Sequence, residues 1–393
     1  APFRDSGGNV TQSRSTLGFV TAVALTLLAP SPASSYPSYA DQQEGSGSSK
    51  FRLHGYGEVH YNNPRTGTMD QNATSELDYH RFVLGWTYEF TPDLRIDAEV
   101  DYEHAAGELE LEYAHLDYDI GAATSLRVGS ILMPVGPLNE YHEPPTFYSV
   151  ERPYVQNSII PTTWQENGAG IVGRASGGSL AYRAFVVAGL DASAFTTSSG
   201  LRGGRSKGIR SKAEDLALVG RIEYATNAGV SFGVSGYYGG ADQMTVDSVD
   251  VKVGLGVADI RYKRHGFDLR ALFARISVDG ADQASVLSGE SIGEAMQGWY
   301  GEAAYDLLRR DRKSDSRRSL WIYTRYERFN TNEEMPAGYV ASPAADRTVY
   351  SGGLAFMPIE SVSFKADVEH WEDETTGSNS QLNRVNVGAA FMF

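Results

Sequence analysis

The stretch that decides the fold is Arg81-Phe-Val-Leu-Gly-Trp-Thr-Tyr-Glu-Phe-Thr-Pro-Asp-Leu-Arg-Ile-Asp-Ala-Glu-Val-Asp-Tyr-Glu103. From Phe82 to Phe90 every second residue is aromatic or aliphatic. After the Thr91-Pro-Asp93 turn, apolar residues alternate without a break with Arg95, Asp97, Glu99, Asp101 and Glu103. Strict alternation of this length predicts strands with one apolar and one charged face. A sandwich core would rarely tolerate such a charged face, whereas the water-filled lumen of a membrane barrel would.

The same period of two recurs along the chain from residue 51 onward. It predicts sixteen strands, at 51–62, 76–91, 93–105, 107–120, 124–134, 167–176, 179–190, 213–226, 229–240, 248–264, 267–279, 297–308, 319–331, 347–358, 361–373 and 382–393. A tilted strand of about ten residues crosses the apolar band of an outer membrane, which is roughly 25 Å thick. Short turns such as His265-Gly266 alternate with long connections at 63–75, 135–166, 191–212, 280–296 and 332–346. We therefore predict an all-β chain whose residues 51–393 form a transmembrane antiparallel β-barrel of about sixteen strands, with one loop constricting the lumen.

Charge and cysteine content exclude several classes of protein. The 34 Lys and Arg residues against 49 Asp and Glu residues give a net charge of -15, which argues against a nucleic-acid-binding protein. The chain has no cysteine, so disulfide frameworks, Cys-ligated zinc, iron–sulfur clusters and Cys nucleophiles are excluded.

The first forty residues have the features of a secretory signal. Arg14 precedes the apolar run Leu17–Ala29, which is too short to span a bilayer, and Ser38-Tyr-Ala40 offers small residues at a cleavage site. We expect residues 1–40 to be a removed signal peptide and residues 41–50, rich in Gly and Ser, to be a disordered leader. Export and a barrel together predict the outer membrane of a bacterium.

The last predicted strand, Leu382–Phe393, resembles the assembly signal of outer-membrane barrels. A terminal strand must be recognised and must then pair with the first strand to remove the edge of the sheet. The residues that carry this resemblance are Asn386, Gly388, Phe391 and Phe393. It implies that the barrel assembly machinery is a partner.

Over residues 51–393 the chain resembles the sixteen-stranded bacterial porins, and among them the phosphate-selective-type family. The resemblance rests on Leu126-Arg-Val-Gly-Ser-Ile-Leu-Met-Pro-Val-Gly136, Asn139-Glu-Tyr-His-Glu-Pro-Pro145 and Arg325-Tyr-Glu-Arg-Phe-Asn-Thr331. It implies a homotrimer, and no ligand residues are carried over from the family.

Evidence for an enzyme or a metal site is thin. Gly229-Val-Ser-Phe-Gly233 matches a nucleophile-elbow pattern, but that motif requires a strand-to-helix turn and Ser231 falls within a predicted strand. His142-Glu143 is followed by two prolines, so it cannot form a helical zinc site. We predict no catalytic residues, no metal and no cofactor.

The segment 135–166 is the predicted constriction. Its prolines and aromatic residues favour an ordered loop, and we expect it to fold into the lumen; an exposed surface loop is the alternative. The candidate constriction residues are Glu140, His142, Glu143, Glu151, Arg152 and Glu166. Alternation turns a set of basic residues inward as a candidate pore wall: Arg81, Arg95, Arg183, Arg221, Arg270, Arg325, Lys365 and Arg384. A basic wall facing an acidic loop would create a transverse field, although these residues could also pair with inward acids and brace the wall. Because inward acids outnumber bases, we expect a mild cation preference.

These features predict a porin, a passive diffusion channel for small hydrophilic solutes and ions. The alternatives are a barrel sheath around an electron-transfer or efflux partner, and an enzyme built into the barrel. Outer-membrane lipid and lipopolysaccharide are expected partners. A basic stretch in the loop 191–212 would either attract anions and lipopolysaccharide or remain a solvated loop: Arg202, Arg205, Lys207, Arg210 and Lys212.

Overall fold

The computed structural model describes residues 50–67, 74–244, 249–309, 318–375 and 381–393. The expected signal peptide and all of the expected leader except Lys50 lie outside these ranges. The described residues form sixteen strands: β1 (Phe51–Gly67), β2 (Glu76–Thr91), β3 (Leu94–Glu103), β4 (Glu108–Gly121), β5 (Thr124–Leu132), β6 (Gln165–Ala175), β7 (Leu180–Ala188), β8 (Leu216–Ala225), β9 (Val230–Gly240), β10 (Lys252–Arg264), β11 (Phe267–Asp279), β12 (Ala295–Asp306), β13 (Ser319–Glu334), β14 (Asp346–Ile359), β15 (Val362–Asp373) and β16 (Gln381–Met392).

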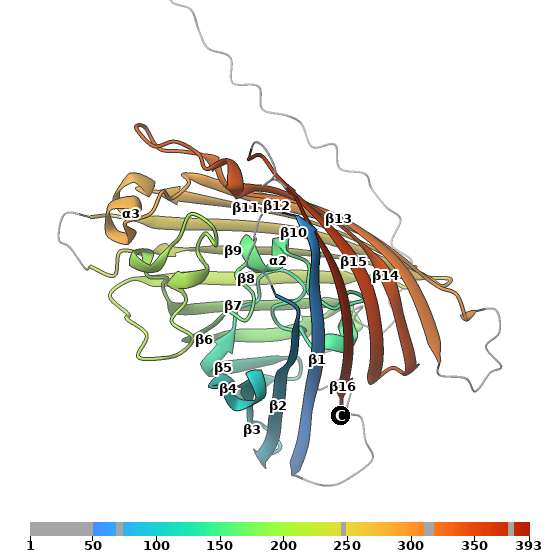
Figure 1. The fold of residues 1–393 in the computed structure, drawn as a ribbon. Helices are drawn as coiled ribbons and strands as arrows, with labels where there is room; N and C mark the ends of the chain where they lie inside the picture. The colour runs from blue at the N-terminus through green and yellow to red at the C-terminus, as the bar shows by residue number, and fades with distance from the viewer. Residues whose placement is uncertain (1–49, 68–73, 245–248, 310–317, 376–380) are drawn as a thin grey trace, which may run out of the picture.

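The strands close into one antiparallel barrel in which each strand pairs with its sequence neighbours and β1 pairs with β16. The chain end completes the closure, because the backbone N–H of Phe393 donates to Gly55 O at 2.9 Å and Gly55 N donates back to Phe393 O at 3.0 Å. Figure 1 shows β1 and β16 side by side. The predicted fold class is therefore confirmed, with strand bounds that shift by a few residues.

The connections are short at one end of the barrel, called here the short-turn rim, and long at the other, the long-loop rim. Two connections depart from this pattern: residues 307–318 are a long connection that joins the short-turn ends of β12 and β13, and residues 104–107 are a short connection between β3 and β4 at the long-loop rim. Short helical segments lie in the connections: η1 (His104–Ala106), η2 (Pro144–Thr146), α2 (Val155–Ser158), η3 (Ser176–Gly178), η4 (Ala192–Ala194), η5 (Arg202–Gly204), α3 (Ala281–Ser288) and η7 (Pro343–Ala345). In the described part of the chain, no helix is both long enough and apolar enough to cross a bilayer.

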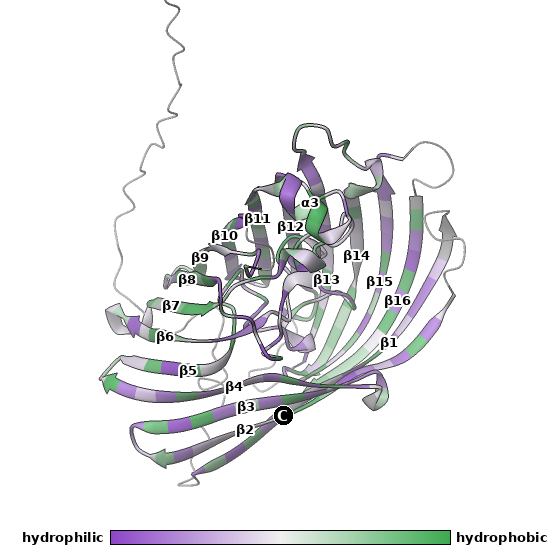
Figure 2. Cartoon of the chain, turned by 90° about the vertical axis from the view of Figure 1, so that its left-hand side faces the viewer, coloured by the Kyte–Doolittle hydropathy of each residue, from purple (hydrophilic) through white to green (hydrophobic). Residues whose placement is uncertain are grey.

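Alternation along the strands separates an apolar exterior from the interior, and Figure 2 shows hydrophobic and hydrophilic residues succeeding one another along them. Outward positions expose large apolar side chains, among them Leu77, Leu218 and Val234, as lipid contact requires. The neighbouring inward positions, such as Arg81, Arg221 and Ser235, are buried.

The alternation of charged residues near the N-terminus predicts a polar interior. The structure shows that the interior is polar only in part. Toward the long-loop rim, β7 to β13 turn apolar side chains inward, and these form one hydrophobic cluster with residues of the connecting loops. Strand members of the cluster include Val187, Val219, Leu255, Ile276, Met296 and Phe329. β7 and β10 carry apolar residues on both faces, so that the outer face meets lipid and the inner face packs against the loops.

Candidate functional site

The connection between β5 and β6, residues 133–164, lies inside the barrel and is called here the inner loop; Figure 1 shows it within the ring of strands, with α2 as its helical part. Gly136, at φ 68°, uses a left-handed conformation that favours glycine, and its N–H donates to Ser235 Oγ of β9 at 3.2 Å. Asn139, which is fully buried, joins the two ends of the loop, called here its neck. Its Nδ2 donates to the carbonyls of Met133 and Trp164 at 2.7 and 2.8 Å, and its Oδ1 accepts from Trp164 N at 2.9 Å.

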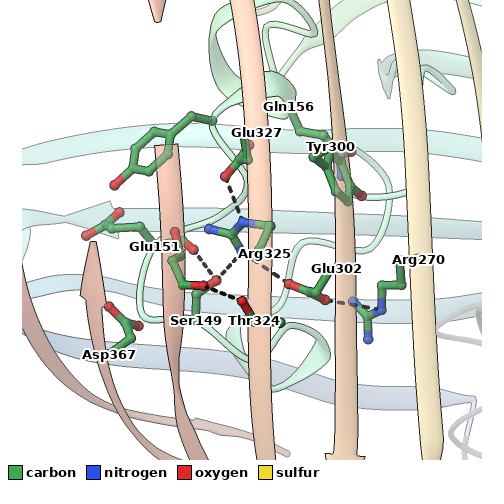
Figure 3. Close-up of polar contacts among 12 residues, drawn as sticks. Ser149, Glu151, Gln156, Arg270, Tyr300, Glu302, Thr324, Arg325, Glu327 and Asp367 are labelled. Carbon is green, nitrogen blue, oxygen red and sulfur yellow. Dashed lines mark hydrogen bonds and ion pairs between the residues drawn. The ribbon is translucent and has the colours of Figure 1, made fainter. Parts of the chain in front are cut away.

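One side of the inner loop is anchored to β13 and β15. Arg325 donates to Ser149 Oγ at 2.6 Å, and Lys365 Nζ donates to the carbonyls of Pro144 and Ser149 at 2.6 and 2.8 Å. The N–H of Val150 donates to a carboxylate oxygen of Asp367 at 2.6 Å. Figure 3 shows Arg325 among Ser149, Glu302 and Glu327. The loop is therefore held by buried, charge-assisted hydrogen bonds, which are among the stronger ones.

The other side of the loop meets the wall of β1, β4 and β7. His142 is hydrogen-bonded to Tyr56 at 2.9 Å and is paired with Glu112, while Glu140 pairs with Arg183 at 3.0 Å. The predicted constriction therefore lies in the lumen and touches walls on opposite sides of the barrel.

The remaining candidate constriction residues occupy different settings. Glu151 accepts from Asn62 at 2.7 Å and lies 3.3 Å from His60; burial opposes its ionisation, but these two partners hold its pKa low, at about 2. Burial raises the pKa of Glu143 to about 7, and among the described residues its Oε2 has no hydrogen-bond partner. Arg152 likewise has a buried Nη2 without a described partner, and burial lowers its pKa.

Glu166 is not part of the inner loop but the second residue of β6. Its carboxylate accepts from Trp164 Nε1 at 3.2 Å and from Ser206 N at 3.0 Å. It therefore joins the neck of the inner loop to the connection between β7 and β8.

The basic stretch in that connection, from Arg202 to Lys212, also forms hydrogen bonds with the inner loop. Arg205 donates to the carbonyls of Pro161, Thr162 and Thr163 at 2.8–3.1 Å, and Arg202 donates to Thr162 O at 2.8 Å. Lys207 pairs with Glu110, and Lys212 pairs with Asp191 at 2.6 Å; Arg210 is exposed. Four of the five side chains thus have partners within the protein.

The candidate wall residues all lie on strands and are mostly neutralised. Five pair with carboxylates of the wall itself at 2.7–3.1 Å: Arg81 with Glu58, Arg95 with Asp117, Arg221 with Asp259, Arg270 with Asp268 and Arg325 with Glu327. Arg183 instead pairs with Glu140 of the inner loop. Lys365 binds loop carbonyls, and Arg384 lies over the ring of Trp371 at 5.5 Å. This pattern favours bracing of the wall over an uncompensated basic surface.

A cavity of about 760 Å³ separates the inner loop from the wall of β3 to β7. It reaches from the turns 122–123 and 176–178 at the short-turn rim to residues 140–143 of the loop. Its charged lining comprises Arg95, Asp97, Glu99, Asp117, Arg127, Glu140, Glu143, Arg174 and Arg183. A space of this size and polarity suits water and small hydrophilic solutes.

The candidate assembly residues lie on or beside β16. Asn386 is buried and donates to Asp367 at 2.8 Å, and Gly388 lies against the inner loop, where an added Cβ would meet Val150 at 3.2 Å. Phe391 and Phe393 stack outside, with ring centroids 6.4 Å apart. Two of the four residues thus also support the inner loop.

The architecture is that of a bacterial outer-membrane porin. DcaP, an outer membrane channel of Acinetobacter baumannii, has a TM-score of 0.59 at 12% identity, covering 87% of this chain and 97% of that one. OprB of Pseudomonas putida has a TM-score of 0.56 at 10% identity, covering 87% and 94%. OmpT of Vibrio cholerae in its trimer form has a TM-score of 0.53 at 10% identity, covering 87% and 99%. The fold matches these porins, and the apolar exterior fits the bilayer of the outer membrane.

No protein-family model matches the chain. Over 352 residues the sequence is 33% identical to an uncharacterized protein of Aquifex aeolicus (strain VF5), covering 85% of this chain and 78% of that protein. The chain belongs to the family of that protein.

Proposed function

We propose that the protein is a porin that lets small hydrophilic solutes and ions diffuse passively across the outer membrane. The observation that carries the proposal is the polar cavity between the inner loop and the wall of β3 to β7. The loop narrows the lumen on one side, and the charged lining keeps the remaining space wet.

Several details of this proposal go beyond the fold. A homotrimer is supported by the trimeric neighbour OmpT. The phosphate-selective-type assignment is supported by the motif Leu126–Gly136, whose Arg127 lines the cavity and pairs with Asp117 at 2.8 Å. Above pH 7, where Glu143 is ionised, the lining holds five carboxylates and four guanidinium groups, which supports a mild cation preference. Lipopolysaccharide and the assembly machinery remain proposed partners.

The two alternatives are less well supported. A sheath for a protein partner would need a wider barrel without an inward loop, whereas residues 133–164 lie inside this lumen and are bonded to β7 and β15. An enzyme is not proposed, because Ser231 lies within β9 in register with Arg261 rather than at a strand-to-helix turn.

Single-channel recording of the purified protein in a planar bilayer tests the proposal. We expect discrete conductance steps from protein that migrates differently on gels before and after boiling, since a closed barrel resists detergent until heated. Boiled protein is the control. Folded, heat-modifiable protein that gives no steps would refute the channel and favour the sheath.

A further inference from the structure

We infer that Asp78, His80 and His104 bind one divalent transition-metal ion, of the Zn²⁺ or Cu²⁺ class, at the long-loop rim. His104 Nδ1 lies 2.7 Å and His80 Nδ1 lies 3.3 Å from the same oxygen, Asp78 Oδ2. One possible ligand atom from each of the three residues lies within 4.8 Å of the other two. This site is independent of conduction through the pore.

Two irregularities of the backbone bring these side chains together. β1 and β2 change register between Glu58, which faces Arg81, and His60, which faces Asp78, so β2 has one extra residue there. Such a bulge lets two consecutive side chains, His80 and Arg81, lie on the inner face. On the neighbouring strand connection, His104 and Ala105 adopt left-handed conformations with φ of 49° and 54°. Left-handed conformations are uncommon for residues other than glycine, and here they place the His104 ring beside Asp78.

The donor set selects a class of metal. Two imidazole nitrogens and one carboxylate oxygen suit Zn²⁺, Cu²⁺ and Ni²⁺, whereas Ca²⁺ and Mg²⁺ prefer oxygen ligands alone. Three protein ligands leave a coordination position for water. The side chains of Asp78, His80 and His104 are 29%, 30% and 51% exposed, so an ion can reach them from solution.

His60 is suited to positioning the site rather than to ligating the ion. Its ring stacks on His80 with centroids 4.8 Å apart and an angle of 11°. Its Nε2 lies 2.8 Å from Glu58 and its Nδ1 lies 3.3 Å from Glu151, so both nitrogens are occupied. The stack thus orients the His80 ring, which is the role of an outer-shell residue.

The test is calorimetric titration of the folded, untagged protein in detergent with Zn²⁺ alone, because a histidine tag would bind the ion. We expect one Zn²⁺ per chain, and we expect Asp78→Asn, His80→Ala and His104→Ala each to weaken binding by at least the roughly 10- to 100-fold that loss of an outer-shell partner costs. The matched control is His265→Ala, which removes a histidine with a φ of 58° at the opposite rim and should leave binding unchanged.

Electron paramagnetic resonance of bound Cu²⁺ gives an independent measurement. Wild-type protein should show coupling to two imidazole nitrogens, and His104→Ala, in an exposed turn, should show one. Heat-modifiable migration checks that each variant is folded. Folded wild-type protein without stoichiometric binding, or binding that survives both histidine substitutions, would overturn the inference. Binding that is lost only when Glu103→Gln and Glu108→Gln are combined would also overturn the inference. The ion would then be held by Glu103, Glu108 and Glu110, which form a separate carboxylate group nearby.

Discussion

Two sectors of the barrel share an exterior pattern but have opposite interiors. From β1 to β5 the inner face carries buried polar groups such as His54, Glu58, Glu99 and Asp117, and the last two line the cavity. From β7 to β13, toward the long-loop rim, the inner face is apolar and is packed against loops. Alternation therefore decides which residues face lipid, while the chemistry of the inner residues decides whether a sector of the lumen holds water.

The two sectors hold the inner loop by different forces. Val155, Ile159, Ile160 and Trp164 bury their side chains in the apolar sector, where stabilisation comes from removal of apolar surface from water. At the polar wall the loop is held by ion pairs, whose desolvation cost offsets much of their attraction. We therefore expect the apolar sector, together with the buried charged anchors on β13 and β15, to fix the loop, and the polar sector to provide the path for solutes.

Trp164→Ala removes a large side chain from the apolar sector and should have the largest effect on the free energy of unfolding. Trp164 is fully buried and packs on Tyr237 with ring centroids 4.9 Å apart. Its truncation leaves a cavity, so we expect the free energy of unfolding to fall by about 5 kcal/mol. Urea unfolding in lipid vesicles measures this loss, and single-channel recording should show a larger and noisier conductance.

Trp299→Ala is the control for this change. Trp299 lies on β12, is 42% exposed and faces outward. It should leave the conductance unchanged. Equal effects of the two tryptophan substitutions on conductance would mean that the apolar sector does not fix the inner loop.

Arg325→Met tests an ion-pair anchor and should cost somewhat less. The guanidinium pairs with Glu302 at 3.2 Å and Glu327 at 2.7 Å, and it holds Ser149 of the inner loop. Its loss removes the closest cation from two buried carboxylates, leaving Glu302 with Arg270 at 3.6 Å and Glu327 with the N–H of Val155 at 3.0 Å, and should lower the free energy of unfolding by about 3–4 kcal/mol.

Arg328→Met is the matched control on the same strand. Arg328 is 50% exposed and pairs with Asp346, and exposed pairs contribute only about 0–1 kcal/mol. The free energies of unfolding of both variants are measured by urea unfolding under the same conditions. Similar losses for Arg325→Met and Arg328→Met would contradict the view that buried pairs anchor the loop.

The strands could be predicted from sequence because lipid imposes a period of two on the outer face of every strand. The sixteen strands were predicted correctly for this reason, and so was the inward course of the inner loop, whose observed bounds are 133–164 rather than 135–166. Glu166 was placed on the loop because a strand boundary leaves little local trace in a sequence.

The packed sector and the bulges could not be predicted by the same reasoning. The inner faces of β7 and β10 carry Val187, Val253 and Leu255, but alternation alone does not say what covers them. A bulge adds one residue and reverses the faces of all that follow, so nothing local showed that His80 and Arg81 share a face. The role of Asn139 depends on Met133 and Trp164, which meet only after folding.

Neutralising the inner-loop acids tests whether the polar sector sets selectivity. Glu140→Gln, Glu143→Gln and Glu151→Gln together remove acids at or near the path and release Arg183 from its ion pair. We expect the permeability ratio to shift toward anions by roughly two- to threefold, measured as the zero-current potential under a salt gradient.

The control neutralises three exposed acids of the long-loop rim, through Asp250→Asn, Asp282→Asn and Glu290→Gln. It changes the net charge equally but leaves the cavity lining intact, so the potential should move much less. A potential that does not respond to the inner-loop substitutions would show that this loop does not set selectivity.

The smallest expected effect concerns a single proton on Glu143. Burial raises the pKa of Glu143 from its ordinary value of 4.5 to about 7, so the side chain is neutral at pH 6 and charged at pH 8. It lines the cavity, so its ionisation adds a negative charge beside the path. The cation preference of the wild-type channel should therefore increase as pH rises through 7.

The measurement is the zero-current potential from pH 6 to 8 for wild-type protein and for Glu143→Gln, and the difference between the two curves isolates this group from others that titrate. The sign for stability is opposite to that for selectivity. The folded protein holds this proton more tightly than the unfolded chain does, so this group makes the free energy of unfolding decrease between about pH 4.5 and 7. Glu143→Gln should remove that slope. If the curves of potential against pH for the two proteins coincide, Glu143 does not ionise beside the solute path. The negative charge of the polar sector would then come from the remaining carboxylates of the cavity.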